Sequence, residues 1–273
     1  MLRADSYGPV TRLDLCADHA VPIDRWSACY LVDGVLFDAA MHHCRDELAS
    51  AVAGRARTVA LTHCHEDHSG GASALAGECR VLAPADHLDL LADPELLTAP
   101  REFLWGRPEP VRGEPLPDEV VEAGRRYEVV PTPGHCPQHV AFVHREEGWV
   151  FGGDLITATR PRFARAEEDL AATVASLRAV AALEPSRLFL AHLPVPERPT
   201  EPIEALLGYL EDRAAEVRDL REAGASVEEI VDRLFGGEYT WWRAGDGSAV
   251  SAKEMTDGDF STANLVEQLL ALG

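Results

Sequence analysis

The sequence predicts a mixed α/β fold, and two kinds of segment support that prediction. Short apolar runs separated by turn residues fill residues 1–83, as expected for a series of strands. Segments with helical periodicity come later in the chain, at residues 169–183, 203–223 and 261–270. A chain of 273 residues is long enough for one large domain with an ample core and a small appendage.

The N-terminal elements can be placed from turn signals. Residues 28–38 read as two short strands around Asp33-Gly34, because Asp-Gly between apolar runs is a typical hairpin turn. A helix is expected at residues 41–54, and another after Gly70 and Gly71. Residues 84–118 are rich in proline and predict a long connection over the surface. We expect it to form part of a pocket wall, with packing filler as an equal alternative, and its tentative substrate-binding residues are Phe103 and Trp105.

Residues 62–71 read Thr-His-Cys-His-Glu-Asp-His-Ser-Gly-Gly and directly follow the apolar run at residues 58–61. His63 and His65 can point the same way, because side chains two residues apart on extended backbone share a face. Asp67 and His68 then add a carboxylate and a third imidazole. A lone histidine is more often a surface or core residue than a ligand, but this clustering favours a metal site. Imidazole with carboxylate suits zinc, iron or manganese.

Three further segments place a ligand-type residue at the end of an apolar run, beside small or turn residues. They contribute His135 after Pro133-Gly134, Asp154 after Gly152-Gly153, and His192 after residues 187–190. Enzymes built on sheets commonly assemble their sites from the ends of several strands. The sequence therefore predicts a metalloenzyme site at one edge of a sheet.

The order His-x-His-x-Asp-His, then His, Asp and His, resembles the metallo-β-lactamase superfamily of dinuclear metallohydrolases. The resemblance covers about the first two hundred residues and implies a four-layer αββα sandwich with a small helical C-terminal extension. It also implies the ligand set: His63, His65 and His135 for one metal ion, Asp67, His68 and His192 for the second, and Asp154 as the bridge. The chain departs from the family pattern at Cys136, where a hydroxyl residue is usual, and at Ala191 and Leu193, where glycines usually flank the last ligand.

The resemblance implies a hydrolase that uses a metal-bridging hydroxide, with Asp67 and Asp154 as the catalytic carboxylates. The cofactors would be two divalent metal ions, with Zn²⁺ preferred and Fe or Mn as alternatives. We expect a small-molecule ester or thioester as substrate, as in glyoxalase II-like and acyl-thioester hydrolases. N-acyl lactone opening is the nearest alternative, followed by ribonuclease or phosphoesterase chemistry. A binding module that has lost catalysis would be expected to have lost ligands as well.

Composition narrows the choice of partner. The chain has 25 basic and 46 acidic side chains, a formal net charge of −21, which disfavours extended contact with nucleic acid. No apolar stretch is long enough to span a membrane, and residues 1–15 have no signal-like apolar core, so a cytoplasmic protein is expected. The six cysteines show no paired metal spacing and are expected to be reduced thiols.

The C-terminal part changes character after Pro194 and Pro196, so we place a catalytic domain at residues 1–200 and a helical extension at residues 201–273. Ser226 and Glu229 form a capping-box signature at the start of one of its helices. The extension is expected to pack on the core, close the cleft or make a homodimer contact. Tyr239, Trp241 and Trp242 are candidates for the pocket wall, with core filler as the commoner role of aromatic residues. Arg160 and Arg162 are tentative contacts for an anionic substrate group, with a solvated loop as the slightly favoured alternative.

Overall fold

The computed structural model describes residues 1–23, 26–243 and 249–272. The chain divides into two compact units, which are described separately. The first unit contains Met1–Thr132, Gln138–Thr157 and Leu183–Pro199. The second contains Pro133–Pro137, Ala158–Ala182 and Thr200–Gly273, so it includes the predicted C-terminal extension and two earlier segments.

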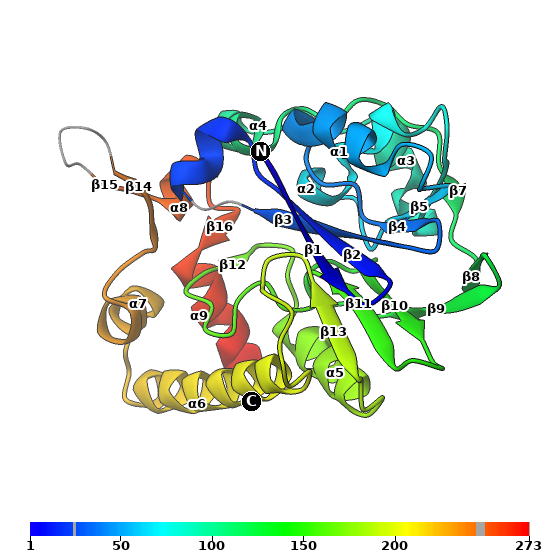
Figure 1. The fold of residues 1–273 in the computed structure, drawn as a ribbon. Coiled ribbons are helices and arrows are strands. Elements are labelled where there is room, and N and C mark those ends of the chain that lie inside the picture. Colours follow the sequence, from blue (N-terminus) through cyan, green and yellow to red (C-terminus); the bar gives the residue numbers. More distant parts are fainter. Residues whose placement is uncertain (24–25, 244–248, 273) are drawn as a thin grey trace. The chain divides into compact units, whose positions relative to one another are not determined.

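A seven-stranded sheet runs through the first unit in the order β1-β2-β3-β4-β5-β6-β7 (Figure 1). Strands β1 to β4 pair antiparallel, whereas β4 to β7 pair parallel. The predicted hairpin is confirmed, with Asp33 and Gly34 at φ 49° and 93° between β3 and β4, as a tight hairpin turn requires. The strands are β1 (Leu2–Tyr7), β2 (Val10–Leu15), β3 (Ser27–Val32), β4 (Val35–Phe37), β5 (Thr58–Ala60), β6 (Arg80–Ala83) and β7 (Glu114–Pro115).

A second sheet of the same unit has five strands in the order β13-β11-β10-β9-β8. Strands β8 to β11 pair antiparallel with their neighbours, whereas β11 and β13 run parallel. Parallel pairing places the carboxyl ends of β11 and β13 at the same edge of the sheet. The strands are β8 (Glu119–Glu122), β9 (Arg125–Pro131), β10 (Val140–His144), β11 (Trp149–Gly153) and β13 (Arg187–Leu190).

An aromatic core joins the two sheets of the first unit. The ring of Phe151 stacks on Phe37 at a centroid distance of 4.2 Å and on Phe189 at 4.8 Å, and all three side chains are fully buried. Tyr127 meets Phe37 edge-on at 5.0 Å. Offset stacks and edge-to-face pairs are the favoured arrangements of buried rings, so this core holds the strands firmly under the site that they carry.

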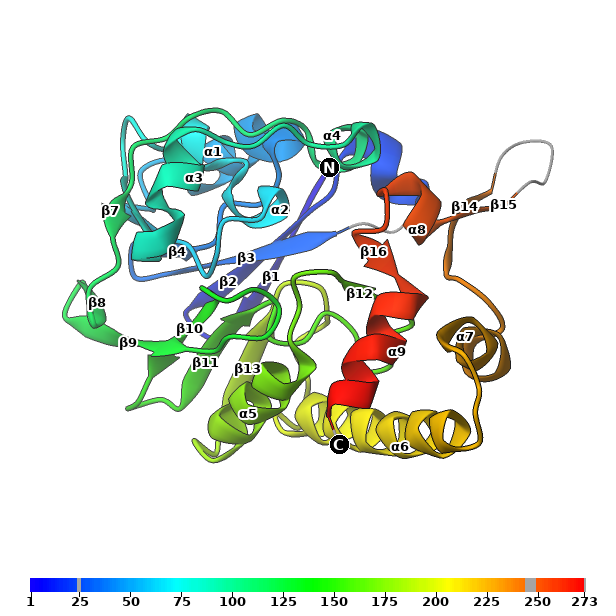
Figure 2. The same ribbon diagram turned by 180° about the vertical axis from the view of Figure 1, so that it is seen from behind.

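Short helices complete the first unit, and α1 to α3 lie on the face of the seven-stranded sheet that points away from β9 to β11 (Figure 1, Figure 2). The helix predicted at residues 41–54 begins as a 3-10 turn, and the helix expected after Gly71 shortens to one turn. The segment at residues 84–118, predicted as a plain connection, contains α3 and α4. The bounds are η1 (Asp18–Ile23), η2 (His42–Cys44), α1 (Arg45–Val52), α2 (Glu66–Ser69), η3 (Ala72–Ala74), η4 (Ala85–His87), α3 (Leu88–Ala92) and α4 (Ala99–Trp105).

The second unit is mainly helical, and α9 lies against α6 and α7. The predicted capping box is confirmed: the Ser226 side chain accepts a hydrogen bond from the Glu229 amide, and the Glu229 side chain accepts one from the Ser226 amide. Gly236 ends that helix in the left-handed conformation, at φ 71°. The elements are β12 (Ala164–Arg165), α5 (Leu170–Ala181), α6 (Glu201–Glu222), α7 (Val227–Phe235), β14 (Thr240–Arg243), β15 (Ala249–Ser251), α8 (Ala252–Met255), β16 (Phe260–Ser261) and α9 (Thr262–Ala271).

Two sequence-based expectations about composition can be compared with the fold. The six cysteines are all free thiols, as predicted. Within the described ranges, no helix combines the length and the apolar character needed to cross a bilayer.

Candidate metal site

Strand direction explains how distant parts of the sequence meet in the first unit. Strands β4 and β5 are parallel, so Asp38 and Thr62 leave the seven-stranded sheet at the same edge. The Asp38 carboxylate accepts hydrogen bonds from the Thr62 amide at 2.8 Å and the Thr62 hydroxyl at 3.0 Å. Strands β11 and β13 are parallel as well, and their ends deliver Asp154 and His192.

His63 and His65 face each other as the spacing in the motif predicts. The Nε2 atom of His63 lies 3.0 Å from Nδ1 of His65, and the Thr62 hydroxyl lies 3.0 Å from Nδ1 of His63. Because the single hydroxyl proton of Thr62 is directed to Asp38, its oxygen accepts from His63 Nδ1–H, which leaves the Nε2 lone pair of His63 facing His65. Two nitrogen ligands of one tetrahedral zinc ion would be about 3.3 Å apart. The pair is therefore suited to hold a cation.

A second cluster brings together two carboxylates and two imidazoles, and its four donor atoms all lie within 4.8 Å of one another. The Nε2 atom of His68 lies 3.1 Å from Oδ1 of Asp154. The Nε2 atom of His192 lies 3.3 Å from the same Asp154 oxygen and 3.3 Å from Oδ2 of Asp67. Asp154 is thus the shared neighbour of both imidazoles in this cluster.

The far sides of these imidazoles are anchored. Nδ1 of His68 lies 2.9 Å from the Asp38 carboxylate, and Nδ1 of His192 lies 2.8 Å from the backbone carbonyl of Trp26. Carboxylate and carbonyl oxygens only accept, so Nδ1 carries the proton in both rings and Nε2 is turned toward Asp154. Histidines that bind metals are commonly oriented in this way, with the second ring nitrogen donating to an oxygen.

Asp38 is a functional residue whose contacts the sequence did not reveal. It is buried and binds both the motif threonine and His68, and its backbone is left-handed at φ 62°. The available signal was its position: a carboxylate directly after β4, a strand parallel to the one that carries the motif. Asp38 therefore orients His68 and holds the start of the motif loop.

The electrostatics of the second cluster favour positive charge. Burial lowers the pKa of His192, but Asp154 and Asp67 outweigh it and raise the pKa to about 10. Burial also lowers the pKa of His68, but the nearby carboxylates outweigh it and hold that pKa well above its usual value. Asp154 is the strongest raising influence. Burial raises the pKa of Asp67, but His68 and His192 more than compensate, so that pKa is lowered. The two carboxylates therefore favour a positive charge at this cluster, which a bound cation would supply.

A divalent cation fits this cluster. Nε2 of His68 is buried and has no hydrogen-bond partner of suitable geometry among the described residues, although Asp154 is near. A buried polar atom without such a partner costs free energy, and coordination to a cation would satisfy it. The donor set of imidazole nitrogen and carboxylate oxygen is the one that zinc and related ions accept.

The remaining predicted site residues have different surroundings. His135 belongs to the second unit, where its Nδ1 lies 3.2 Å from Glu168, so its role as a ligand of the first ion stays a prediction. Arg162 donates to the Phe235 carbonyl at the end of α7, and its guanidinium lies 5.8 Å from the centre of the Tyr239 ring. These two contacts favour a structural role for Arg162 over a role in binding an anion. Arg160 is exposed to solvent. The side chains of Trp241 and Trp242 lie outside the described residues.

Helix α4 lies against the metal motif through an ion pair that the sequence did not predict. The guanidinium of Arg101 contacts both oxygens of the Glu66 carboxylate, at 2.6 and 2.7 Å. Glu66 stands between His65 and Asp67 and is buried. The same helix carries Phe103, which is 52% exposed, and the half-buried Trp105. Both tentative substrate contacts therefore sit on an element tied to the motif loop.

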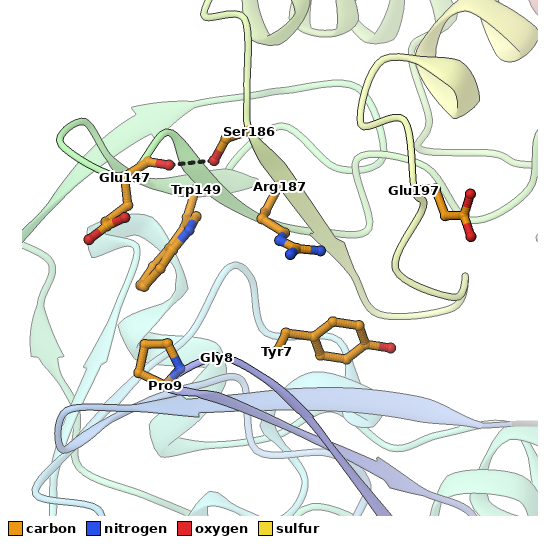
Figure 3. A pocket seen from close by; sticks show the side chains of 8 residues that line it. All are labelled: Tyr7, Gly8, Pro9, Glu147, Trp149, Ser186, Arg187 and Glu197. Carbon is orange, nitrogen blue, oxygen red and sulfur yellow. Dashed lines mark hydrogen bonds between the residues drawn. The ribbon is translucent and has the colours of Figure 1, made fainter.

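A surface pocket of about 490 Å³ lies elsewhere in the first unit (Figure 3). Trp149 and Arg187 start strands β11 and β13, whereas Asp154 and His192 follow the ends of the same strands. The pocket is therefore at the opposite edge of the sheet from the metal cluster. Its lining consists of Tyr7, Gly8, Pro9, Glu147, Trp149, Ser186, Arg187 and Glu197.

Comparison with known proteins defines the family. Residues 27–192, more than half of the chain, match the model of the metallo-β-lactamase superfamily. The chain belongs to this superfamily, which confirms the resemblance found in its motifs. It is a metal-dependent hydrolase, a conclusion that the relatives below support.

A hydroxyacylglutathione hydrolase of Acidiphilium cryptum is 28% identical over 239 residues, 84% of this chain and 88% of that protein. A β-lactamase-like protein 2 homolog of Drosophila melanogaster is 30% identical over 170 residues, 59% of this chain, and the match spans only 52% of that relative. The thioesterase pkgB of Emericella nidulans is 32% identical over 127 residues, 46% of this chain and 31% of that protein.

Solved structures confirm the fold class. A metallo-β-lactamase family protein of Thermus thermophilus superposes with a TM-score of 0.68 at 20% identity, covering 95% of this chain and 92% of that one. A β-lactamase domain protein of Burkholderia ambifaria gives a TM-score of 0.70 at 18% identity, with coverages of 98% and 87%. At these identities the similarity establishes the fold alone.

Proposed function

We propose that this chain is a dinuclear hydrolase of a small-molecule ester or thioester. One divalent ion, Zn²⁺ by preference, would be bound by His63, His65 and His135, and a second by Asp67, His68 and His192, with Asp154 between them. The observation that carries the proposal is the convergence of His68 and His192 Nε2 on one Asp154 oxygen, at 3.1 and 3.3 Å.

The bound cations and the side chains of the protein would have different roles in the hydrolysis. Bound divalent ions would supply an activated water near neutral pH and a positive charge for the substrate oxygen that becomes negative. Asp38 and the Trp26 carbonyl keep the two imidazoles fixed, so the site needs little rearrangement to act. Asp67, which His192 contacts at 3.3 Å, is the candidate to orient the attacking water or accept its proton.

The acyl-thioester assignment rests on the relatives. The match to the hydroxyacylglutathione hydrolase covers most of both chains, whereas the match to the thioesterase covers 46% of this chain and 31% of that protein. The net charge of −21 opposes binding of polyanionic RNA, so the acyl substrates are preferred over phosphodiesters. We expect the protein to act in the cytoplasm.

The first prediction concerns Asp154. Asp154→Asn removes the shared negative charge while keeping the side chain's size, so metal content should fall from two ions per chain and turnover should drop by at least a hundredfold. Metal content by mass spectrometry and kcat on a thioester measure both effects. The exposed Asp5→Asn is the matched control and should behave as wild type. Full activity of Asp154→Asn at unchanged metal content would contradict the bridging role.

Activity against a panel of substrates distinguishes thioester hydrolysis from lactone opening and RNA cleavage. Thioesters, N-acyl lactones and single-stranded RNA should be offered to the same metal-loaded preparation. We expect the highest kcat/KM on a thioester. A preference for lactones would move the assignment to lactone opening, and RNA cleavage alone would refute the acyl assignment.

A further inference from the structure

His139 is a buried histidine beside the metal cluster that the proposed chemistry does not use. It stands directly before β10 in the first unit and is 1% exposed. Its Nδ1 lies 3.1 Å from the Thr132 carbonyl oxygen and 2.8 Å from the Thr132 hydroxyl. Its Nε2 lies 3.1 Å from the backbone nitrogen of Asp154. The imidazole therefore links the end of β9 to the residue that follows β11.

The partners fix the tautomer of this ring. The Asp154 backbone N–H can only donate, so Nε2 of His139 is the acceptor and carries no proton. The Thr132 carbonyl can only accept, so Nδ1 carries the proton and donates to it. Both nitrogens are directed at backbone atoms, which separates His139 from His68 and His192, whose Nε2 atoms face carboxylates.

The backbone at Asp154 needs such support because the strand becomes irregular there. The pairing of β11 with β13 shifts register between Phe151 and Gly153, and Gly153 is left-handed at φ 47°. A side chain at Gly153 would collide with Thr62, since an added Cβ would lie 2.5 Å from the threonine hydroxyl. The turn that carries Asp154 is therefore packed against Thr62, and its backbone is held by His139.

His139 also contacts the other candidate donor pair. Its ring lies 5.2 Å from the ring of His63, centroid to centroid, at an angle of 49°. One neutral imidazole therefore touches a donor of the first pair through its ring and Asp154 through its Nε2.

We propose that His139 is a positioning residue for Asp154: by accepting the Asp154 N–H it fixes the place of the carboxylate that His68 and His192 share. The inference rests on the proposed metal site but not on any particular substrate. Its specific consequence is that the Nε2 acceptor matters more for metal affinity than the Nδ1 donor.

The test replaces His139 by two amide side chains, each of which can replace one of the two hydrogen bonds that the imidazole makes. In His139→Gln the side-chain oxygen can reach the position of Nε2 and accept from Asp154. In His139→Asn the shorter amide can replace only the donor to Thr132. His144→Gln is the control, a buried histidine at the far end of β10 whose Nε2 accepts from Arg125. The readouts are Co²⁺ affinity and the Co²⁺ absorption spectrum of each full-length variant, with the unfolding midpoint of the metal-free form.

We expect His139→Gln and the control to keep Co²⁺ affinity within about threefold, and His139→Asn to lose between about tenfold and a hundredfold with a changed spectrum. The unfolding midpoints of the two His139 variants should be alike. Equal affinities for Gln and Asn, or an Asn loss matched by an equal loss in the control, would overturn the inference. A wild type that binds two Co²⁺ ions but hydrolyses nothing in the panel would overturn the proposed function alone.

Discussion

At the scale of single residues, the site depends on oxygens that hold imidazoles in place. His68 is oriented by Asp38 and His192 by the Trp26 carbonyl. These partners are remote from their histidines in sequence, and a backbone carbonyl leaves no mark in a sequence at all. The donors themselves are recognisable residue types at strand ends, whereas the groups that aim them become visible only in three dimensions.

Asp38→Asn tests this orienting role. Asparagine has the same size and tolerates the left-handed backbone, but it loses the charge that accepts from His68 and Thr62 together. Loss of such a partner typically weakens metal binding by about 10- to 100-fold. Competition with a chelator measures the Zn²⁺ affinity.

The matched control for this variant is Asp33→Asn, because Asp33 is also left-handed but lies in the β3–β4 turn. The control should keep wild-type Zn²⁺ affinity. Equal affinities in both variants and the wild type would show that Asp38 does not support the site.

At the scale of elements, the Glu66–Arg101 pair is the contact that ties α4 to the motif loop. The side-chain exposures are 5% for Glu66 and 18% for Arg101, so the pair is largely shielded from water. Arg101→Met would leave a buried carboxylate without its guanidinium, which typically costs about 3–5 kcal/mol. The free energy of unfolding in urea should fall by that order, and KM should rise because α4 carries Phe103 and Trp105.

An exposed ion pair provides the comparison. Arg80 and Glu114 approach to 2.7 Å, but their side chains are 60% and 58% exposed. Arg80→Met should cost only about 0–1 kcal/mol. If both Met variants lose the same small amount, the buried pair does not anchor α4.

The 3-10 turn η4 contributes a pH dependence through His87. Burial lowers the pKa of this histidine, although Gln138 and Asp86 oppose the effect. Because the folded pKa lies below the unfolded one, the unfolded chain binds the proton first as pH falls. The stability is then fully present above about pH 6.5 and is lost as the pH drops toward the folded pKa.

The stability difference between pH 7.5 and pH 5.5 should therefore be smaller in His87→Leu than in the wild type. One proton accounts for at most about 1.4 kcal/mol per pH unit. His87→Gln should show the same reduction, since it also lacks the titrating group, even if its absolute stability differs. An unchanged pH dependence of the stability in both variants would show that His87 does not contribute to it.

At the scale of the whole molecule, local patterns predicted the architecture well where each element follows from its own residues. The hairpin at Asp33-Gly34, the capping box at Ser226 and the helices of the second unit were predicted from neighbouring residues alone. The fold class followed from the motif order and agrees with the solved structures.

The predictions failed where packing decides the conformation. An added Cβ at Gly70 would lie 2.4 Å from the His42 backbone nitrogen, and one at Gly71 would lie 2.2 Å from the Ala39 carbonyl oxygen. These two glycines therefore pack closely on the segment after β4. The chain forms only a single helical turn beyond them, where a longer helix was expected. Likewise, α4 is stabilised by Glu66, a partner 35 residues away that no local pattern contains.

An anomalous difference map at the zinc edge, from crystals grown with Zn²⁺, tests the two-ion site most directly. We expect two peaks per chain, one bound by His63 and His65 and the other by His68 and His192, with the Asp154 carboxylate touching both. Peaks away from these side chains, or a single peak with Asp154 uninvolved, would contradict it.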